Sequence, residues 1–312
     1  MTVMGGSAGV APGALRAAAL ILPPAIWASL IVVGTEAMVA VPPLALTVAS
    51  WFIAALTLLP LAISEMRGRL GQLAIEAPWI LMLGVTGTTG FQYLWFEGLS
   101  RANPVNVAIL TPTLPVFVAV AACLLLKELR GWAVFSGAVL ILFATLLLAT
   151  EAQPDRLLSL RLGSGELLIL AANVLMTVYT IGLRLRPTRL PAILFLWAVI
   201  TAGLAPLLLI AALVPGIWPG TDGVSRHVPA LIYLGVVAYV IAYLLWNYSV
   251  TVNGAALSGL FLYLQPILGI ALAALYLDLP VHWYHAASIS LALLGLMCVL
   301  DWREVLRRGV RT

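Results

Sequence analysis

Long apolar stretches separated by short polar connections recur along the whole 312-residue chain. Ten can be drawn, at residues 17–36, 41–63, 79–98, 104–126, 131–150, 165–184, 191–214, 229–250, 254–277 and 283–301. Each is about 20 residues long, the length at which an α-helix crosses the hydrocarbon core of a bilayer. The connections 64–78, 151–164 and 215–228 carry Gly, Pro and charged residues typical of loops. The pattern predicts an all-α integral membrane protein with ten transmembrane helices.

The fourth and ninth stretches resemble each other, which indicates an internal repeat. A shift of 151 residues places Pro115 on Pro266 and Trp95 on Trp246. We therefore predict two five-helix units, at 17–150 and 165–301, followed by a basic cytoplasmic tail at 302–312. Because each unit has an odd number of spans, the second unit enters the membrane from the opposite side. The predicted repeat is inverted.

Prolines interrupt both repeated stretches, Pro112 and Pro115 in the first and Pro266 in the second. Proline has no backbone N–H, so a carbonyl one turn earlier loses its helical partner. Such a break is tolerated at membrane depth only against protein or a water-filled cavity. Interrupted spans at matching places in two halves are typical of a transporter's binding site. We predict helix breaks with a gating role at these three prolines.

Composition narrows the class of protein further. The chain is 63% hydrophobic and 9% charged, whereas a soluble domain has about 25% charged residues. The apolar runs are continuous and do not alternate with polar residues, which excludes a transmembrane β-barrel. Cys123 and Cys298 each lie within an apolar span, and we interpret them as small core residues.

The 16 Lys and Arg residues lie in loops and in the C-terminal tail without forming a patch, so we expect no nucleic-acid partner. If the N-terminus is cytoplasmic, the ten-span arrangement places 12 of them inside and 4 outside. This is the bias that the positive-inside rule requires. We predict a multi-pass protein of the cell (inner) membrane with both termini cytoplasmic.

Several of these residues carry a family resemblance. Mid-span Pro115 is followed by Leu126, by Glu128 and then by Gly137 at the start of another span, and Trp27-Ala28-Ser29 lies in the first span. This pattern resembles the EamA-type ten-helix branch of the drug/metabolite transporter superfamily. The second unit departs from it, because Leu279 stands in the place of the Glu and Ser288 in the place of the Gly.

A second resemblance concerns the substrate. Trp246-Asn247, followed by Tyr263-Leu264-Gln265-Pro266, is similar to the aromatic amino-acid exporter branch of that superfamily. Together the two resemblances imply a secondary transporter that exports small amphipathic metabolites, such as aromatic amino acids, by alternating access to a central cavity.

Polar and aromatic side chains within the spans are the candidates for substrate binding. Tyr239, Tyr243, Trp246 and Asn247 share one helical face, and such a stripe offers ring faces and amides to a zwitterion or an aromatic compound. An aromatic belt at the membrane interface is the alternative interpretation. For Gln265, capping of the carbonyls freed by Pro266 is the alternative to facing the cavity. The candidate substrate-binding residues are Trp27, Gln92, Trp95, Asn106, Asn173, Tyr179, Tyr243, Trp246, Asn247, Tyr263 and Gln265.

The charged residues within the spans bear on the alternatives to this function. Glu97 and Arg101 are spaced as an i, i+4 ion pair, and Glu128 lies beside Lys127 and Arg130 at the inner boundary. No cluster of metal ligands or nucleophiles is evident, so we expect no enzymatic activity, metal or cofactor. A proton-coupled exporter of drugs or other organic cations is the alternative function, and it generally needs a deep carboxylate.

The expected partners are a small-molecule substrate and the lipid bilayer, and both a monomer and a homodimer are left open. Gly84, Gly87 and Gly90 leave little side chain between neighbouring helices, so we predict a close helix crossing at this point.

Overall fold

The chain is helical, without a strand, over the residues that the computed structural model describes, which are 13–128, 132–158, 161–218, 221–268 and 282–299. The first half contains α1 (Gly13–Ala37), α2 (Pro43–Met66), α3 (Leu70–Leu83), η1 (Gly84–Gly90), α4 (Phe91–Arg101), α5 (Pro104–Leu110), α6 (Thr113–Ala121), η2 (Ala122–Leu126) and α7 (Trp132–Ala149). A short helix, α8 (Pro154–Leu158), precedes the second half. The second half contains α9 (Ser164–Leu185), α10 (Ala192–Leu213), α11 (Thr221–Ile232), η3 (Tyr233–Ile241), α12 (Ala242–Asn253), α13 (Ala255–Phe261) and α15 (Trp283–Val299).

Within the described residues, seven helical segments are long and apolar enough to cross a membrane. They are Gly13–Ala37, Pro43–Met66, Leu70–Arg101, Asn106–Leu126, Ser164–Leu185, Ala192–Leu213 and Arg226–Asn253. Three shorter apolar helices accompany them, at Phe135–Ala149, Ala255–Leu268 and Trp283–Cys298. The protein is therefore a multi-pass membrane protein. The predicted tail at 302–312 and the end of the ninth span lie outside the described residues.

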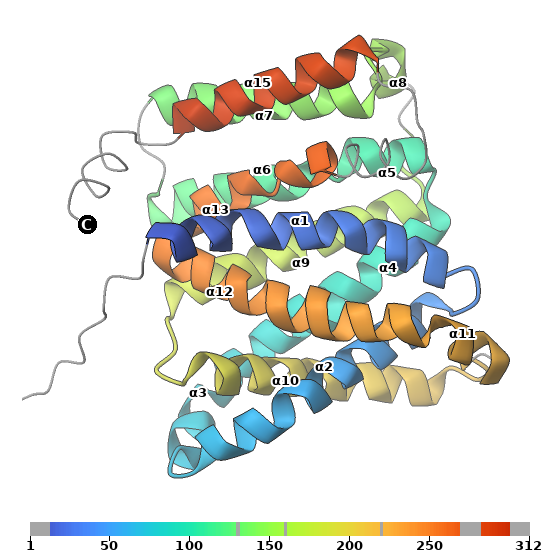
Figure 1. The fold of residues 1–312 in the computed structure, drawn as a ribbon, viewed down its shortest axis with the longest axis vertical. Coiled ribbons are helices and arrows are strands. Elements are labelled where there is room, and N and C mark those ends of the chain that lie inside the picture. Colours follow the sequence, from blue (N-terminus) through green and yellow to red (C-terminus); the bar gives the residue numbers. More distant parts are fainter. Residues whose placement is uncertain (1–12, 129–131, 159–160, 219–220, 269–281, 300–312) are drawn as a thin grey trace, which may run out of the picture.

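The helices run side by side across the molecule in layers (Figure 1). α7 packs on α15 at one end of the stack, and α2 packs on α10 at the other. Between them, α4 packs on α9, α1 on α12 and α6 on α13. The end of α2 lies beside the start of α10, where the backbone N–H of Leu194 donates to the Glu65 carboxylate over 3.1 Å. These two helices are therefore antiparallel.

A glycine contact lets helices of the two halves approach closely. A Cβ atom on Gly84 would lie 2.6 Å from the carbonyl oxygen of Val199 and 2.7 Å from the backbone nitrogen of Gly203. Because lipid is as apolar as the side chains, association within a membrane depends on such close packing. This contact confirms the close crossing predicted from the glycines of this span.

The predicted loops at 64–78 and 215–228 are partly helical, because a helix begins inside each of them, earlier than the hydropathy indicates. α3 begins at Leu70 and α11 at Thr221, and each continues through a proline, Pro78 in one and Pro229 in the other. The residues before these prolines are more polar than a membrane span, although they are helical. In α3, Glu76 explains why the polar turn is ordered: its carboxylate accepts hydrogen bonds from the hydroxyl of Thr188 at 2.5 Å and from the backbone of Arg189 at 3.3 Å.

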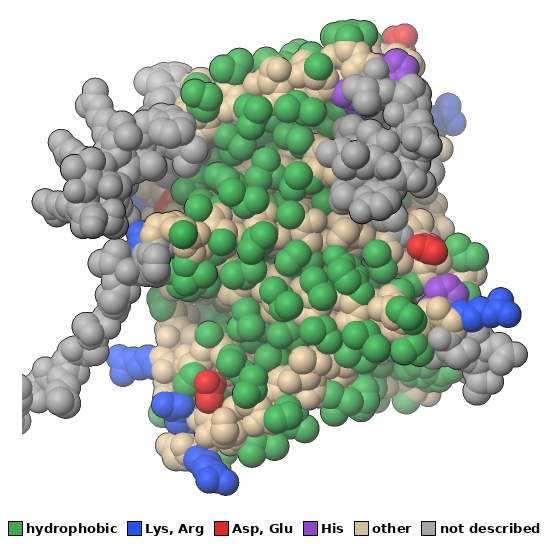
Figure 2. All heavy atoms as spheres, viewed as in Figure 1, with side chains coloured by type: hydrophobic (Ala, Val, Ile, Leu, Met, Phe, Trp, Pro, Cys, Tyr) green, Lys and Arg blue, Asp and Glu red, His purple; other side chains and the backbone are tan. Residues whose placement is uncertain are grey.

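The surface separates apolar from charged side chains. Figure 2 shows hydrophobic side chains across the layers, with most of the charged and histidine side chains near the two ends of the helices. This is the arrangement that a bilayer around the middle of the helices requires. Cys123 and Cys298 are both exposed, so their interpretation as core residues is wrong. They lie on the outer faces of apolar helices, where a small weakly polar thiol is tolerated.

Candidate functional site

Two helices are interrupted at corresponding places. A turn at residues 111–112 separates α5 from α6, and a turn at 262–263 separates α13 from the helical residues 264–268. Pro115 and Pro266 cannot donate to the carbonyls of Thr111 and Leu262. The residue before each proline donates instead, Leu114 to Thr111 at 3.4 Å and Gln265 to Leu262 at 2.9 Å. The backbone of Gln265, and not its side chain, therefore satisfies the carbonyl.

Both breaks border one small internal cavity of about 40 Å³. Its lining residues are Trp27, Leu30, Phe91, Gln92, Trp95, Thr111, Leu114, Asn173, Met176 and Gln265. They come from α1, α4, α9 and the two interrupted helices, so both halves of the chain contribute. Small-molecule sites usually measure about 300 to 1,000 Å³, and this cavity has room for a few water molecules only. The described conformation is closed around it.

Five predicted residues line this cavity: Trp27, Gln92, Trp95, Asn173 and Gln265. Neither glutamine makes a side-chain hydrogen bond with the described part of the chain. An amide without a hydrogen-bond partner costs free energy in an apolar interior unless a ligand or water bonds to it. None of the lining side chains carries a charge. The cavity therefore offers rings and neutral hydrogen-bonding groups.

An aromatic cluster packs against the cavity through Trp27. The ring of Trp27 lies 5.4 Å from that of Trp246 and 5.5 Å from that of Tyr243. Trp51 stacks on Tyr239 at 4.1 Å and meets the edge of Tyr243 at 5.2 Å. All five rings are at most 8% exposed. The stripe in the eighth span therefore faces the interior of the protein and forms no interfacial belt.

Sequence reasoning did not select every residue of this region. Trp51 belongs to the aromatic cluster, and its only signal was a tryptophan beside Ser50 in the middle of a span. Phe91 and Leu114 line the cavity next to the selected Gln92 and Pro115. Leu30 and Met176 give no signal, because nothing distinguishes them from other apolar residues of a span.

Three other predicted residues lie outside the cavity wall. The hydroxyl of Tyr179 donates to Oδ1 of Asn247 over 2.7 Å, so these two side chains satisfy each other. Tyr263 packs into a smaller cluster with Ile141 and Leu296, on the side of α7 and α15.

Asn106 lies at the end of the helices where α9 begins. Its Nδ2 donates over 2.8 Å to the carboxylate of Glu166, which also accepts from the backbone of Asn103 at 3.2 Å and of Gly163 at 3.0 Å. Glu166 is 5% exposed. Its carboxylate therefore ties the start of α5 to the start of α9 and closes this end.

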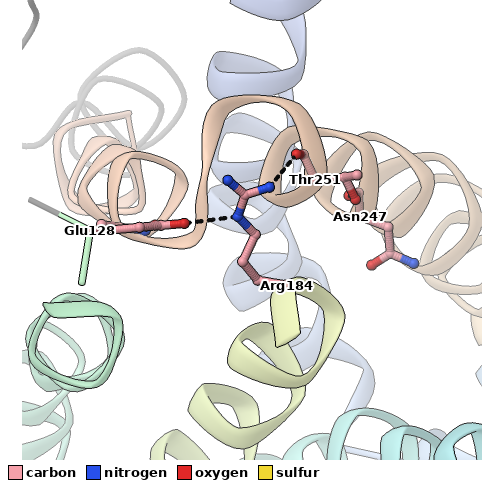
Figure 3. A network of polar contacts seen from close by, with 5 residues as sticks. Glu128, Arg184, Asn247 and Thr251 are labelled. Atoms are coloured by element: carbon pink, nitrogen blue, oxygen red, sulfur yellow. Dashed lines mark hydrogen bonds and ion pairs between the residues drawn. The ribbon is translucent and has the colours of Figure 1, made fainter. Parts of the chain in front are cut away.

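The opposite end is closed by an ion pair between Glu128 and Arg184 (Figure 3). Nε of Arg184 lies 2.8 Å from the Glu128 carboxylate, and its Nη1 donates to the carbonyl of Thr251 at 2.9 Å. The same carboxylate accepts from the backbone N–H of Ala256 at 3.0 Å. Glu128 thus joins the end of η2 to α9 and to the start of α13, and its partner Arg184 lies 56 positions along the chain.

We expect Glu128→Ala to lower the free energy of unfolding by about 1 to 2 kcal/mol, because the change removes both a partly buried ion pair and the cap of α13. Thermal unfolding of the purified protein in detergent measures this. Glu97→Ala is the matched control, since Glu97 pairs with Arg101 one turn away on the same helix, and such pairs contribute only about 0.3 to 0.5 kcal/mol. Equal effects of the two variants would contradict the linking role of Glu128.

The chain is similar to known proteins both in sequence and in fold. The family model described as "EamA-like transporter family" matches residues 15–150 and 163–301. A solved crystal structure superposes on the chain with a TM-score of 0.73 at 21% identity, covering 96% of this chain and 98% of the other. At this identity the likeness concerns the fold alone.

Named relatives are similar over most of their length. The uncharacterized transporter YyaM of Bacillus subtilis is 23% identical over 72% of this chain and 74% of the relative. The probable terminal-alkyne amino-acid exporter of Streptantibioticus cattleyicolor is 28% identical over 81% and 85%. The aromatic amino acid exporter YddG of Ancylobacter novellus is 25% identical over 78% and 82%. These are names of transporters and not of enzymes, and the family model covers most of the sequence. The chain belongs to the EamA-like transporter family.

Proposed function

We propose that the protein is a secondary transporter that exports small amphipathic metabolites, aromatic amino acids among them. One observation carries this proposal: the cavity beside both helix breaks is lined by three aromatic rings and three amide side chains, with no charged group. Ring faces suit an apolar or aromatic side chain, and amides suit a carboxylate and an amine. The names of two relatives, an amino-acid exporter and an aromatic amino acid exporter, are consistent with this substrate class.

The proposed mechanism is alternating access by two inverted five-helix units, 17–150 and 165–301, with ten spans in total. Three features support it. The breaks at 111–112 and 262–263 correspond under the shift of 151 residues. The π-helical η1 overlaps η3 under the same shift, and π-helical turns are frequent at functional sites. The contacts of α4 with α9 and of α1 with α12 are the pairs that an exchange of the two units would interconvert.

In this mechanism the two ends open in turn, and each end has its own carboxylate link. Opening of the Glu128 end requires the Arg184 contact to break, and opening of the Glu166 end requires the Asn106 contact to break. The cavity widens as either end opens. We propose that the Glu128 end faces the cytoplasm, with both termini on that side of the cell (inner) membrane, because the Arg-rich connections lie on this side in the ten-span arrangement.

Counterflow into proteoliposomes tests the function. Vesicles that contain the protein and unlabelled tryptophan should accumulate external labelled tryptophan above the level of protein-free vesicles. A thermal-shift panel of amino acids, drugs and organic cations in detergent identifies other ligands, because a ligand that binds the folded state raises the unfolding temperature. Flux of organic cations in exchange for protons, without flux of any amino acid, would refute the proposal in favour of a cation exporter.

A further inference from the structure

The amide of Asn173 has a defined orientation. Asn173 lies in α9 and is fully buried. Its Nδ2 donates over 2.9 Å to the hydroxyl oxygen of Thr113 and lies 3.4 Å from the carbonyl oxygen of Leu110. The Thr113 hydroxyl donates its own hydrogen to the same Leu110 carbonyl, at 2.7 Å. Both neighbours are therefore acceptors, so the NH₂ group must face them and Oδ1 must face away.

The oxygen of this amide is left without a partner. Oδ1 of Asn173 is buried and makes no hydrogen bond with any of the described residues. A buried acceptor of this kind costs free energy unless a donor reaches it. Asn173 lines the cavity, together with the rings of Trp27, Phe91 and Trp95. The missing donor can therefore come from a molecule inside the cavity.

The surroundings of Oδ1 favour a positively charged donor. Aromatic rings attract an ammonium group through their negative faces. A hydrogen bond to a charged donor is also stronger than one to a neutral donor. The lining contains no acidic side chain, so nothing in the wall selects a molecule with a net positive charge. A zwitterion, whose ammonium is balanced by its own carboxylate, fits these conditions better than a simple cation.

We propose that Oδ1 of Asn173 accepts a hydrogen bond from the primary ammonium group of the substrate, while the amides of Gln92 and Gln265 donate to its carboxylate. The substrates are then free α-amino acids with an apolar or aromatic side chain. Gln92 and Gln265 then select zwitterions over simple cations, and Asn173 selects them over carboxylates that lack an amine. This assignment rests on the proposed transport function and adds the group of the substrate that each amide recognises.

Competition with labelled tryptophan in the counterflow assay tests the assignment. Tryptamine lacks the carboxylate, and indole-3-propionate lacks the amine. For the unaltered protein, we expect each analogue to compete at least about tenfold less well than tryptophan, because each loses a hydrogen bond to a charged group. Indole-3-propionate competing as well as tryptophan would overturn the assignment without any variant, so the test does not depend on a mutant folding.

Asn173→Asp gives the second arm of the experiment. A carboxylate at this position adds a negative charge, so tryptamine should gain on tryptophan by about tenfold or more. Asn253→Asp is the matched control, since Asn253 bonds Ser249 and the carbonyl of Arg16 outside the cavity wall, and it should leave the ratio unchanged. An unchanged ratio in Asn173→Asp would overturn the assignment while tryptophan flux persists. If the unaltered protein transported no amino acid, the proposed function itself would be overturned.

Discussion

Replacing Gln265 by Leu should reduce the initial rate of tryptophan counterflow by about 10- to 100-fold at subsaturating substrate. The side chain borders the cavity directly after one helix break and has no hydrogen-bond partner in the described part of the chain. In the proposed complex its amide binds the substrate's carboxylate, and a hydrogen bond to a charged group contributes about 1.5 to 3 kcal/mol. Leucine has a similar size, and its backbone can still donate to Leu262, so the break itself is preserved.

Tyr263→Phe is the control for this variant. Tyr263 lies two residues away on the same interrupted segment, but its ring packs into the small cluster beside Ile141 and Leu296. Removal of its hydroxyl should leave the rate within about twofold of the unaltered protein, since no hydrogen bond to substrate is lost. Comparable losses in both variants, or a normal rate in Gln265→Leu, would show that the substrate does not bind at this cavity.

Gly203→Leu should cost about 3 kcal/mol or more of stability, enough to lower the thermal unfolding temperature in detergent by several degrees. A Cβ atom on Gly203 would clash with the carbonyl oxygen of Gly84 and with Cβ of Thr88. The first of these obstacles is backbone, which cannot move aside as a flexible side chain can. The hydroxyl of Thr89 also donates to the carbonyl of Gly203 over 2.5 Å, so separation of α10 from η1 would break this bond.

Gly71→Leu is the corresponding control in α3, because a Cβ atom there meets nothing within 4 Å. Both variants add the same side chain to a helical glycine, and only the close crossing differs between them. We expect the Gly71 variant to unfold within about 2 °C of the unaltered protein, as surface substitutions usually do. If the Gly203 variant were equally stable, the two halves would not be in backbone contact at this point.

Some features of the site followed from local chemistry and could be predicted. Pro115 and Pro266 recur at the shift of 151 residues, and each removes one backbone hydrogen bond from its helix. Gln92, Asn173 and Gln265 are amides in apolar spans, and such amides must face protein, water or a ligand in any arrangement of the helices. All three do line the cavity.

Other contacts depend on which groups meet in space. Asn106 and Asn173 are both amides in apolar spans, but the carboxylate of Glu166 accepts a hydrogen bond from the Asn106 amide. Glu128 pairs with Arg184, 56 positions along the chain. No spacing rule within one helix contains this information.

The sequence by itself therefore determined the membrane class and the positions of the two helix breaks near Pro115 and Pro266. Each of these depends on properties that a short segment carries alone, namely the length of an apolar run and the missing N–H of proline. Only the tertiary structure decided which polar side chains satisfy one another and which lack a partner among the described residues. That outcome depends on hydrogen bonds between distant segments, and a single changed neighbour alters it.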